Sequence, residues 1–299
     1  MTTTTTSTLT LAYTQAATLG EGLQWRDGRW WWTDIEAAQL HAWQPGAEAA
    51  QTYRLPDRLG CFAHARSGRM VLGLAKRLCL GTLNGPDMSL QALVGVDTTE
   101  PRTRVNDGRT DRRGYFVFGT LNEQAERRPI ASFYQYSMQH GLRRLALPAV
   151  AIANSICFSL DGRTMYFCDT LSQLIQQCDY DAETAQVSNI RPFVRMEDKH
   201  AWPDGAVIDA EGCLWNAQWG AGRVLRYAPD GRELARYTAT APHTSCPHLG
   251  GERGDQLMVT TARQELSREQ LAAHPLSGSL FGIQLDKPLG VPDALFDDE

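Results

Sequence analysis

Four polar side chains that can bind a metal recur at one spacing, because each stands seven or eight residues before a turn glycine. They are Glu21, Asn106, Asn154 and Asp204, and each begins an apolar run with the composition of a β-strand. These residue types are poor strand formers. Any one of them alone has a local explanation, as an Asx-turn at Asn154 or Asp204 or as a solvated carboxylate at Glu21. Four at the same spacing indicate oxygen atoms gathered around one point.

Oxygen ligands of this kind predict a divalent metal ion. The carboxylates of Glu21 and Asp204 repel each other at short range unless a cation lies between them. A set of Glu, Asn and Asp oxygens suits Ca²⁺, Mg²⁺ or Mn²⁺, with Ca²⁺ as the first expectation. Fe²⁺ and Zn²⁺ stay open, because geometry and metal availability also decide which ion binds. We therefore predict one divalent metal ion.

The elements that must position these residues repeat along the chain. A polar-Gly turn, an aromatic or β-branched run, a short polar gap and a second run recur in six units. The turn glycines stand at positions 28, 68, 114, 162, 212 and 254, so successive units are 40 to 50 residues apart. A repeat of this length with several strands per unit is typical of a β-propeller. The sequence predicts an all-β, six-bladed propeller with four-stranded antiparallel blades.

This architecture explains why the four polar residues would meet. The innermost strand of every blade runs beside the central channel, so residues that begin these strands converge from different blades. In the last blade the corresponding position lies around Ser245 and Cys246. The turn that follows each innermost strand marks its far end.

The two ends of the chain have separate expectations. A strand near residues 9–13 has no partner in the first unit and is predicted to complete the last blade, which closes the ring and removes two open sheet edges. Residues 1–8 are predicted to be a disordered leader, and residues 9–299 a single propeller domain. The clearest helical pattern is Leu266–His274, with Ser267 as its N-cap, read as a short insertion in the last blade.

Composition excludes several classes of protein. The formal net charge of −5 gives no electrostatic reason to bind nucleic acid or an acidic membrane. The longest apolar run, residues 145–153, is far shorter than the roughly 20 residues that span a bilayer, and the start of the chain lacks the pattern of a secretory signal. Seven cysteines without a C-x-x-C pair predict buried free thiols in a cytoplasmic protein.

Other candidate sites are weaker. His243, Cys246 and His248 superficially resemble a zinc site, but their spacing on a strand points the side chains to different faces. No G-x-S-x-G elbow supports a Ser-His-Asp triad. The tryptophans at 30–32 are read as blade packing, whereas Trp202 and Trp219 are better placed to line a pocket.

The motifs that carry these residues resemble a known family. They are LGEGLQW, RVNDGRTDRRGYFVFGTLNE, NSICFSLDGRTMYFCDT, PDGAVIDAEGCLWNAQWGAGRVLRYAPDG and TTARQELSREQLAAHPLSGSLFGI. In this order and spacing they resemble the SMP-30/gluconolactonase/regucalcin-like sugar lactonases, which are six-bladed propellers. The last motif resembles bacterial xylonolactonase- and arabinolactonase-type members most. The resemblance covers nearly the whole chain.

The resemblance implies roles for individual residues. The family's single divalent metal would be held by Glu21, Asn154 and Asp204. The family's Arg-x-Asn substrate-binding pair falls on Arg104 and Asn106. A further substrate-binding carboxylate falls at Glu123 or Gln124, and counting from Gly119 favours Gln124.

The implied activity is hydrolysis of a sugar lactone to the aldonic acid in cytoplasmic sugar oxidation. Asp204 is our candidate for the general base, because it adjoins the metal and has a second oxygen to take a proton. The expected partner is a small sugar lactone, with no nucleic acid and no membrane, and the protein is expected to be a monomer or weak homo-oligomer. The alternatives are a non-catalytic metal-binding or interaction propeller and a related propeller esterase or phosphotriesterase.

Overall fold

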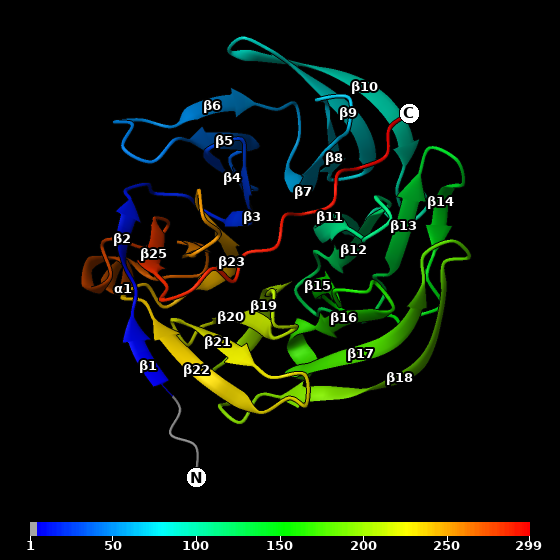
Figure 1. Ribbon diagram of the computed structural model, residues 1–299. Coiled ribbons are helices and arrows are strands. Elements are labelled where there is room, and N and C mark those ends of the chain that lie inside the picture. Colours follow the sequence, from blue (N-terminus) through cyan, green and yellow to red (C-terminus); the bar gives the residue numbers. More distant parts are fainter. Residues whose placement is uncertain (1–4) are drawn as a thin grey trace. The chain divides into compact units, whose positions relative to one another are not determined.

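The structure is a computed structural model that describes residues 5–299. Apart from a short 3-10 turn, η1 (Thr170–Ser172), and one helix, α1 (Arg268–Ala273), the regular elements of these residues are β-strands. The strands form six sheets, five with four strands and one with five (Figure 1). The predicted fold class, a six-bladed β-propeller with four-stranded antiparallel blades, is confirmed.

Four blades are built from consecutive strands, counted outward from the innermost strand. The first contains β3 (Gly20–Arg26), β4 (Arg29–Asp34), β5 (Gln39–Trp43) and β6 (Gln51–Arg54). The second contains β7 (Leu59–His64), β8 (Met70–Leu74), β9 (Arg77–Asn84) and β10 (Asp87–Gly95). The third contains β11 (Thr103–Thr110), β12 (Phe116–Asn122), β13 (Phe133–Ser137) and β14 (Gly141–Arg144). The fourth contains β15 (Ala153–Phe158), β16 (Thr164–Asp169), β17 (Leu174–Asp181) and β18 (Gln186–Arg195).

The fifth blade corrects one expectation. It contains β19 (Trp202–Ile208), β20 (Leu214–Trp219), β21 (Arg223–Tyr227) and β22 (Glu233–Thr238), and β1 (Thr5–Thr8) adds to it as a fifth strand parallel to β22. Residues 1–8 were predicted to be disordered. The first four lie outside the described residues, but residues 5–8 are a strand, because their β-branched threonines supply backbone partners for an open sheet edge.

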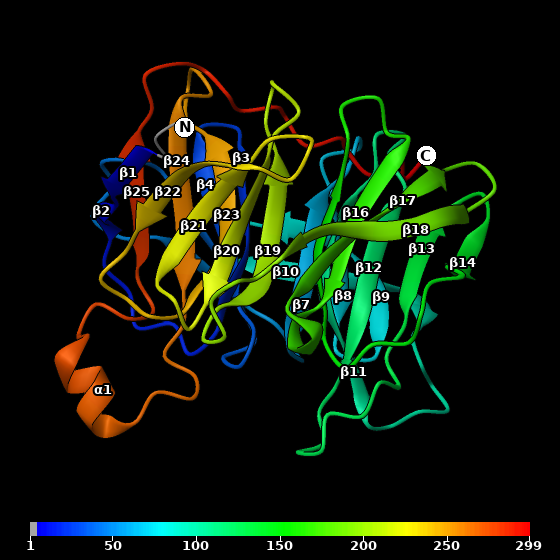
Figure 2. The same cartoon turned by 90° about the horizontal axis from the view of Figure 1, so that it is seen from below.

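The sixth blade joins the two ends of the chain. It contains β23 (Thr244–Gly250), β24 (Gln256–Thr261) and β25 (Leu280–Gln284), and β2 (Thr10–Tyr13) pairs antiparallel with β25. The predicted role of the N-terminal strand is confirmed. The helix α1 stands off this blade in Figure 2, with the predicted N-cap Ser267 closing a capping box. Among residues 5–299 no helix has the length and apolar character needed to cross a membrane.

Backbone contacts divide the chain into two units. The first contains residues 5–37, His41–Gln51 and Met196–Pro292. The second contains Ala38–Leu40, Thr52–Arg195 and Asp293–Glu299. Trp30 and Trp32 are buried in the core of the first unit, so their reading as packing residues is confirmed. The cores of the second unit are built from aromatic and aliphatic residues of the second, third and fourth blades. All seven cysteines are buried free thiols, as predicted.

The end of the chain is part of the second unit. Phe296 is fully buried against blades two and three and stacks on Tyr136. Its backbone NH donates to the carbonyl of His64, and Asp297 pairs with Arg66 at 2.8 Å. This segment therefore holds two blades by packing as well as by hydrogen bonds.

Candidate functional site

The innermost strands share a β-bulge near their beginning. In β19, Pro203 pairs with Gln218 and Ala206 with Asn216, so Asp204 and Gly205 lie opposite a single residue of β20. Strands β3, β11, β15 and β23 show the same change of register. A bulge bends the strand and turns side chains away from the regular alternation of a sheet. The bulge therefore interrupts the regular alternation of side chains at the place where the predicted site residues stand.

The bulges divide these residues into two registers. Glu21 and Asn154 are the last paired residues before the bulge, whereas Asn106 and Asp204 lie inside it. The prediction of a single shared register was wrong by one residue. Counting back from the turn glycine misses this difference because the hairpins differ in length.

The first and fourth blades position Glu21 and Asn154 in the same way. The carboxylate of Asp34, at the end of β4, accepts hydrogen bonds from the NH groups of residues 18 and 19 at 2.9 and 3.1 Å. The carboxylate of Asp169, at the end of β16, does the same for residues 151 and 152 at 3.0 and 3.2 Å. Both aspartates therefore fix the chain just before the bulged strand.

The residue after each of these two side chains is left-handed. Gly22 has a φ of 62° and Ser155 a φ of 59°. Glycine adopts this conformation freely, but a buried serine does so at a cost, which is observed most often at functional sites. The strain at Ser155 marks the backbone that presents Asn154.

A hydrogen-bonded chain in the second unit connects three of the predicted site residues. Arg104 Nη1 donates to Asn106 Oδ1 at 2.8 Å, and Asn106 Nδ2 donates to Asn154 Oδ1 at 3.1 Å. On its other side, Asn154 Nδ2 donates to the hydroxyl oxygen of Thr170 at 2.8 Å. All four side chains are buried. The predicted Arg-x-Asn pair and the predicted ligand Asn154 are thus brought together.

The orientations of the two amides in this network follow from their hydrogen-bond partners. Asn106 Nδ2 also donates to the carbonyl of Ala153 at 3.0 Å, and Arg104 can only donate. The amide of Asn106 therefore has one orientation, with its NH₂ group toward Asn154. Asn154 must in turn present its oxygen on that side. The neighbouring Asp107 accepts from the NH of Ile156 at 2.8 Å, and burial raises the pKa of its carboxyl.

The structure distinguishes Glu123 from Gln124. Glu123 follows β12, and its Oε1 lies 3.8 Å from Arg104 Nε. Gln124 is exposed, and its backbone NH donates to Asn122 Oδ1 at 2.9 Å. Of the two candidates, Glu123 is therefore the one in ion-pair distance of the Arg-x-Asn pair, although counting from the sequence favoured Gln124.

The first unit carries the two predicted carboxylate ligands. Asp204 is buried, and Asn216 Nδ2 donates to the backbone carbonyls of Asp204 and Gly205 at 3.1 Å each. A Cβ at Gly205 would lie 2.9 Å from the Cys246 backbone, so the absence of a side chain lets β19 approach β23 at the bulge. Glu21 is half-buried, and its Oε2 accepts from the NH of Gly22 at 3.2 Å.

Two aromatic residues lie at the same end of the fifth blade as Asp204. Trp219 pairs with Trp202 across β19 and β20, and both side chains are partly exposed. The ring of Trp219 stacks on His243 with centroids 4.1 Å apart. Both side chains are thus partly exposed near the start of β19, and a role in lining a pocket stays a prediction.

Comparison with known proteins identifies the family. A family model described as SMP-30/Gluconolactonase/LRE-like region matches residues 19–263. The chain belongs to this family. The resemblance stated from the sequence motifs is therefore confirmed.

Relatives extend the match to most of the chain. An L-arabinolactonase from Azospirillum brasilense is 44% identical, over 89% of this chain and 88% of the relative. A 6-deoxy-6-sulfogluconolactonase from Pseudomonas putida is 32% identical, over 97% of this chain and 98% of the relative. The solved structure of a calcium-binding regucalcin from Agrobacterium tumefaciens is 28% identical, with a TM-score of 0.90 over 98% of this chain and 99% of that one. The family therefore includes sugar lactonases, which are hydrolases of lactone esters.

The residues present fit the metal that the family resemblance implies. Glu21, Asn154 and Asp204 can each offer a side-chain oxygen atom, and each stands beside or inside the bulge of its strand. The amide oxygen of Asn154 is oriented by Asn106 and already faces a polar partner. No cluster of three or more His, Cys, Asp and Glu side chains suited to a metal occurs among residues 5–299. The predicted ligand set is not such a cluster, because it contains two carboxylates and one amide.

The zinc alternative finds no support. His243 Nδ1 lies 3.0 Å from the carbonyl oxygen of Gln264, and its ring stacks on Trp219. His248 is buried, and its ring forms a T-shaped contact with Trp30. The two imidazoles are thus held in separate surroundings.

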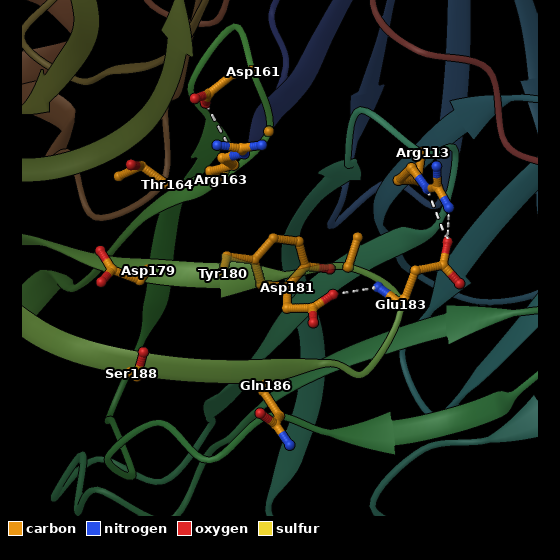
Figure 3. Close-up of a pocket in the computed structure, with 12 residues that line it drawn as sticks. Arg113, Asp161, Arg163, Thr164, Asp179, Tyr180, Asp181, Glu183, Gln186 and Ser188 are labelled. Carbon is orange, nitrogen blue, oxygen red and sulfur yellow. Dashed lines mark hydrogen bonds and ion pairs between the residues drawn. The ribbon is translucent and has the colours of Figure 1, made fainter.

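A large cavity lies elsewhere in the second unit. Its volume is about 670 Å³, and Figure 3 shows its lining, which comes from the β15–β16 turn, the β17–β18 hairpin and Arg113. Arg113 pairs with Glu183 there. The cavity lies at the hairpin end of the fourth blade, whereas Asn154 begins β15 at the other end. It contains none of the predicted site residues.

Sequence reasoning missed two members of the network. Thr170 bonds Asn154, and Arg58 pairs with Glu123 at 2.6 Å. Thr170 follows the strand-ending Asp169, a position that the first blade fills with Ile35. Arg58 lies in a loop with no distinctive pattern, so no sequence signal marks it.

Proposed function

We propose that the protein hydrolyses the ester bond of a sugar 1,4- or 1,5-lactone to give the aldonic acid, in cytoplasmic sugar oxidation. Membership of a family that contains sugar lactonases supports this activity. The observation that carries it for this chain is the buried Arg104–Asn106–Asn154 network, which joins the predicted substrate-binding pair to a predicted ligand.

Glu21, Asn154 and Asp204 would hold one divalent metal ion, with Ca²⁺ as the first candidate and Zn²⁺, Mn²⁺, Mg²⁺ and Fe²⁺ as alternatives. When bound, such an ion polarises a carbonyl and lowers the pKa of a water. The hard oxygen ligands and the calcium-binding regucalcin relative support Ca²⁺.

Asp204 would act as the general base. Its carboxylate is buried, and its backbone is fixed by Asn216 on the bulge. It would take a proton from the water whose oxygen attacks the lactone carbonyl carbon. The ring C–O bond then breaks, and the same proton passes to the departing ring oxygen. The products are one hydroxyl group and one carboxylic acid, which ionises and releases a proton to solvent.

Arg104 and Asn106 would bind the lactone. A guanidinium and an amide can hydrogen-bond sugar hydroxyls and the oxygen on which negative charge develops during attack. Both side chains are buried and mutually oriented before substrate arrives. Such preorganisation limits the reorganisation needed in the transition state.

Proton release gives the test. A weakly buffered solution of 1,4- and 1,5-aldonolactones is followed by pH indicator with active protein, heat-denatured protein and protein treated with a chelator. The proposal predicts acidification above the spontaneous rate, lost with chelator and restored by one of the five ions. Equal rates in all three samples, across the panel, would instead favour a non-catalytic metal-binding propeller.

A further inference from the structure

Two arginines share one carboxylate in the second unit. Glu123 Oε1 lies 2.6 Å from Arg58 Nη1 and 3.8 Å from Arg104 Nε. The side chains of Arg58 and Glu123 are 30% and 31% exposed, whereas that of Arg104 is 5% exposed. The Arg58–Glu123 pair is thus partly exposed to solvent and lies beside the buried Arg104.

The backbone on both sides of this ion pair is fixed. The carbonyl of Arg58 accepts from the NH of Ala75 at 2.9 Å, and the NH of Arg58 donates to Asp57 Oδ1 at 2.8 Å. The NH of Glu123 donates to the carbonyl of Arg102 at 2.8 Å. Neither side chain therefore needs to order a loop to reach the other.

The two carboxylate oxygens of Glu123 differ in their contacts. Both arginine contacts are made by Oε1, and Oε2 accepts no hydrogen bond from the part of the chain that the structure describes. An ionised carboxylate oxygen is a strong acceptor, and a hydroxyl group is its natural donor. Oε2 is therefore suited to accept a hydrogen bond from a sugar hydroxyl.

We propose that Arg58 is a positioning residue for substrate specificity, an inference that rests on the proposed lactonase function. It holds Glu123 so that Oε2 binds a hydroxyl group of a polyhydroxylated lactone. It also supplies the nearer cation for Glu123, which leaves Arg104 committed to Asn106.

Loss of Arg58 would have two physical consequences. Arg104 would become the nearest cation to Glu123, so the carboxylate would be drawn toward it and away from its present position. Arg104 would then be shared between Glu123 and Asn106 Oδ1. Because an exposed ion pair contributes little to stability, the variant is expected to fold.

The test compares two lactones with the same ring. D-Glucono-1,5-lactone carries hydroxyls, and δ-valerolactone carries none. For R58M we expect kcat/KM on the gluconolactone to fall about tenfold, mainly through a higher KM, as for loss of one charge-assisted hydrogen bond. The kcat/KM on δ-valerolactone should fall much less, because this lactone has no hydroxyl group to lose its contact with Glu123 and is affected only through Arg104. R58K should recover part of the loss, and R58M/E123Q should be no worse than E123Q.

The matched control is R102A. Arg102 forms a neighbouring exposed pair with Glu100 at 2.6 Å, and among residues 5–299 its side chain makes no ion pair or hydrogen bond with Glu123. R102A should behave as wild type on both lactones. Equal losses on both lactones in R58M, or no loss on either, would overturn the inference about Arg58 and leave the proposed lactonase function standing. If wild-type protein hydrolyses no lactone of a wider panel, the proposed function fails and the inference fails with it.

Discussion

Asn106 Nδ2 donates to Asn154 Oδ1 at 3.1 Å, across the bulges of β11 and β15. The same NH₂ group donates to the carbonyl of Ala153, and the Asn106 oxygen accepts from Arg104. One amide thus uses both ends to join Arg104, a candidate substrate-binding residue, to a metal-ligand candidate. Any change to Asn106 should affect both.

Asn106→Asp removes the donor but keeps the shape. The carbonyl of Ala153 and the oxygen of Asn154 would then face a buried carboxylate, so we expect the free energy of unfolding to fall by about 1–3 kcal/mol. We also expect kcat/KM on the best lactone to fall at least about tenfold. Urea denaturation and pH-indicator kinetics measure the two effects. Asn84→Asp, at an exposed pair with Ser89, is the control and should change neither.

Gly60→Ala tests the close approach of two innermost strands. A Cβ at Gly60 would lie 2.5 Å from the carbonyl oxygen of Val105 and 2.7 Å from that of Asn106. Because both contacts are backbone atoms of the bulge, we expect a loss of about 1–3 kcal/mol in the free energy of unfolding, together with lower lactonase activity. At Gly81 the three atoms nearest to an added Cβ belong to the flexible side chains of Met88 and Leu72. If Gly81→Ala is as harmful as Gly60→Ala, the bulge contact is not the cause.

Phe296→Ala tests the C-terminal segment. The side chain is fully buried and packs between two blades of the second unit. We expect unfolding to become easier by about 3–5 kcal/mol because a large cavity forms. Leu160→Ala, at a side chain that is 46% exposed, should cost far less. A Phe296→Ala variant as stable as Leu160→Ala in urea would show that the segment is not a structural clamp.

His41 predicts a pH dependence of stability. Trp32 Nε1 donates to Gln15 Oε1 at 2.8 Å, so the Gln15 NH₂ group faces His41 Nε2 at 3.0 Å and the imidazole must accept there. Burial lowers the pKa of His41 from 6.5 to about 4 in the folded protein. The unfolded chain therefore binds a proton at higher pH than the folded chain does. The contribution of neutral His41 to the free energy of unfolding is fully present above pH 6.5 and is lost as the pH falls toward 4.

The size of this effect is about 3 kcal/mol over that window, from about 1.4 kcal/mol for each pH unit. His41→Gln removes the group. The difference in unfolding free energy between wild type and His41→Gln should shrink by about that amount between pH 7 and pH 4, measured by urea denaturation. A constant difference would show that His41 takes up its proton in the folded protein as readily as in the unfolded chain.

Local sequence patterns predicted the fold because each blade repeats the same pattern of strand, polar-Gly turn and strand. The turn at Asp209–Gly212 lies between β19 and β20, and Ser267 caps α1, as expected from single-residue preferences. The strand at residues 5–8 was missed because a run of threonines becomes ordered only when the open edge of β22 is beside it. That edge is not visible in a local sequence window.

The site was predicted less completely than the fold. The sequence marks Glu21, Asn154 and Asp204 as polar residues in apolar strands. The bulge changes the register of these residues by one position, and counting back from the turn glycine does not reveal that change. Arg58 and Glu123 are 65 residues apart and meet only through tertiary structure. Sequence spacing therefore finds site residues that recur from blade to blade, whereas site residues that do not recur are found only in the structure.

Asp204→Asn tests the central claim most directly. The amide keeps an oxygen that can bind a metal but cannot take a proton at neutral pH. The measurement pairs elemental analysis of the purified variant with kcat on the best lactone. The account predicts a metal content close to that of wild type and a kcat lower by about 100-fold or more. A variant that retains its metal and hydrolyses the lactone at the wild-type rate would contradict it.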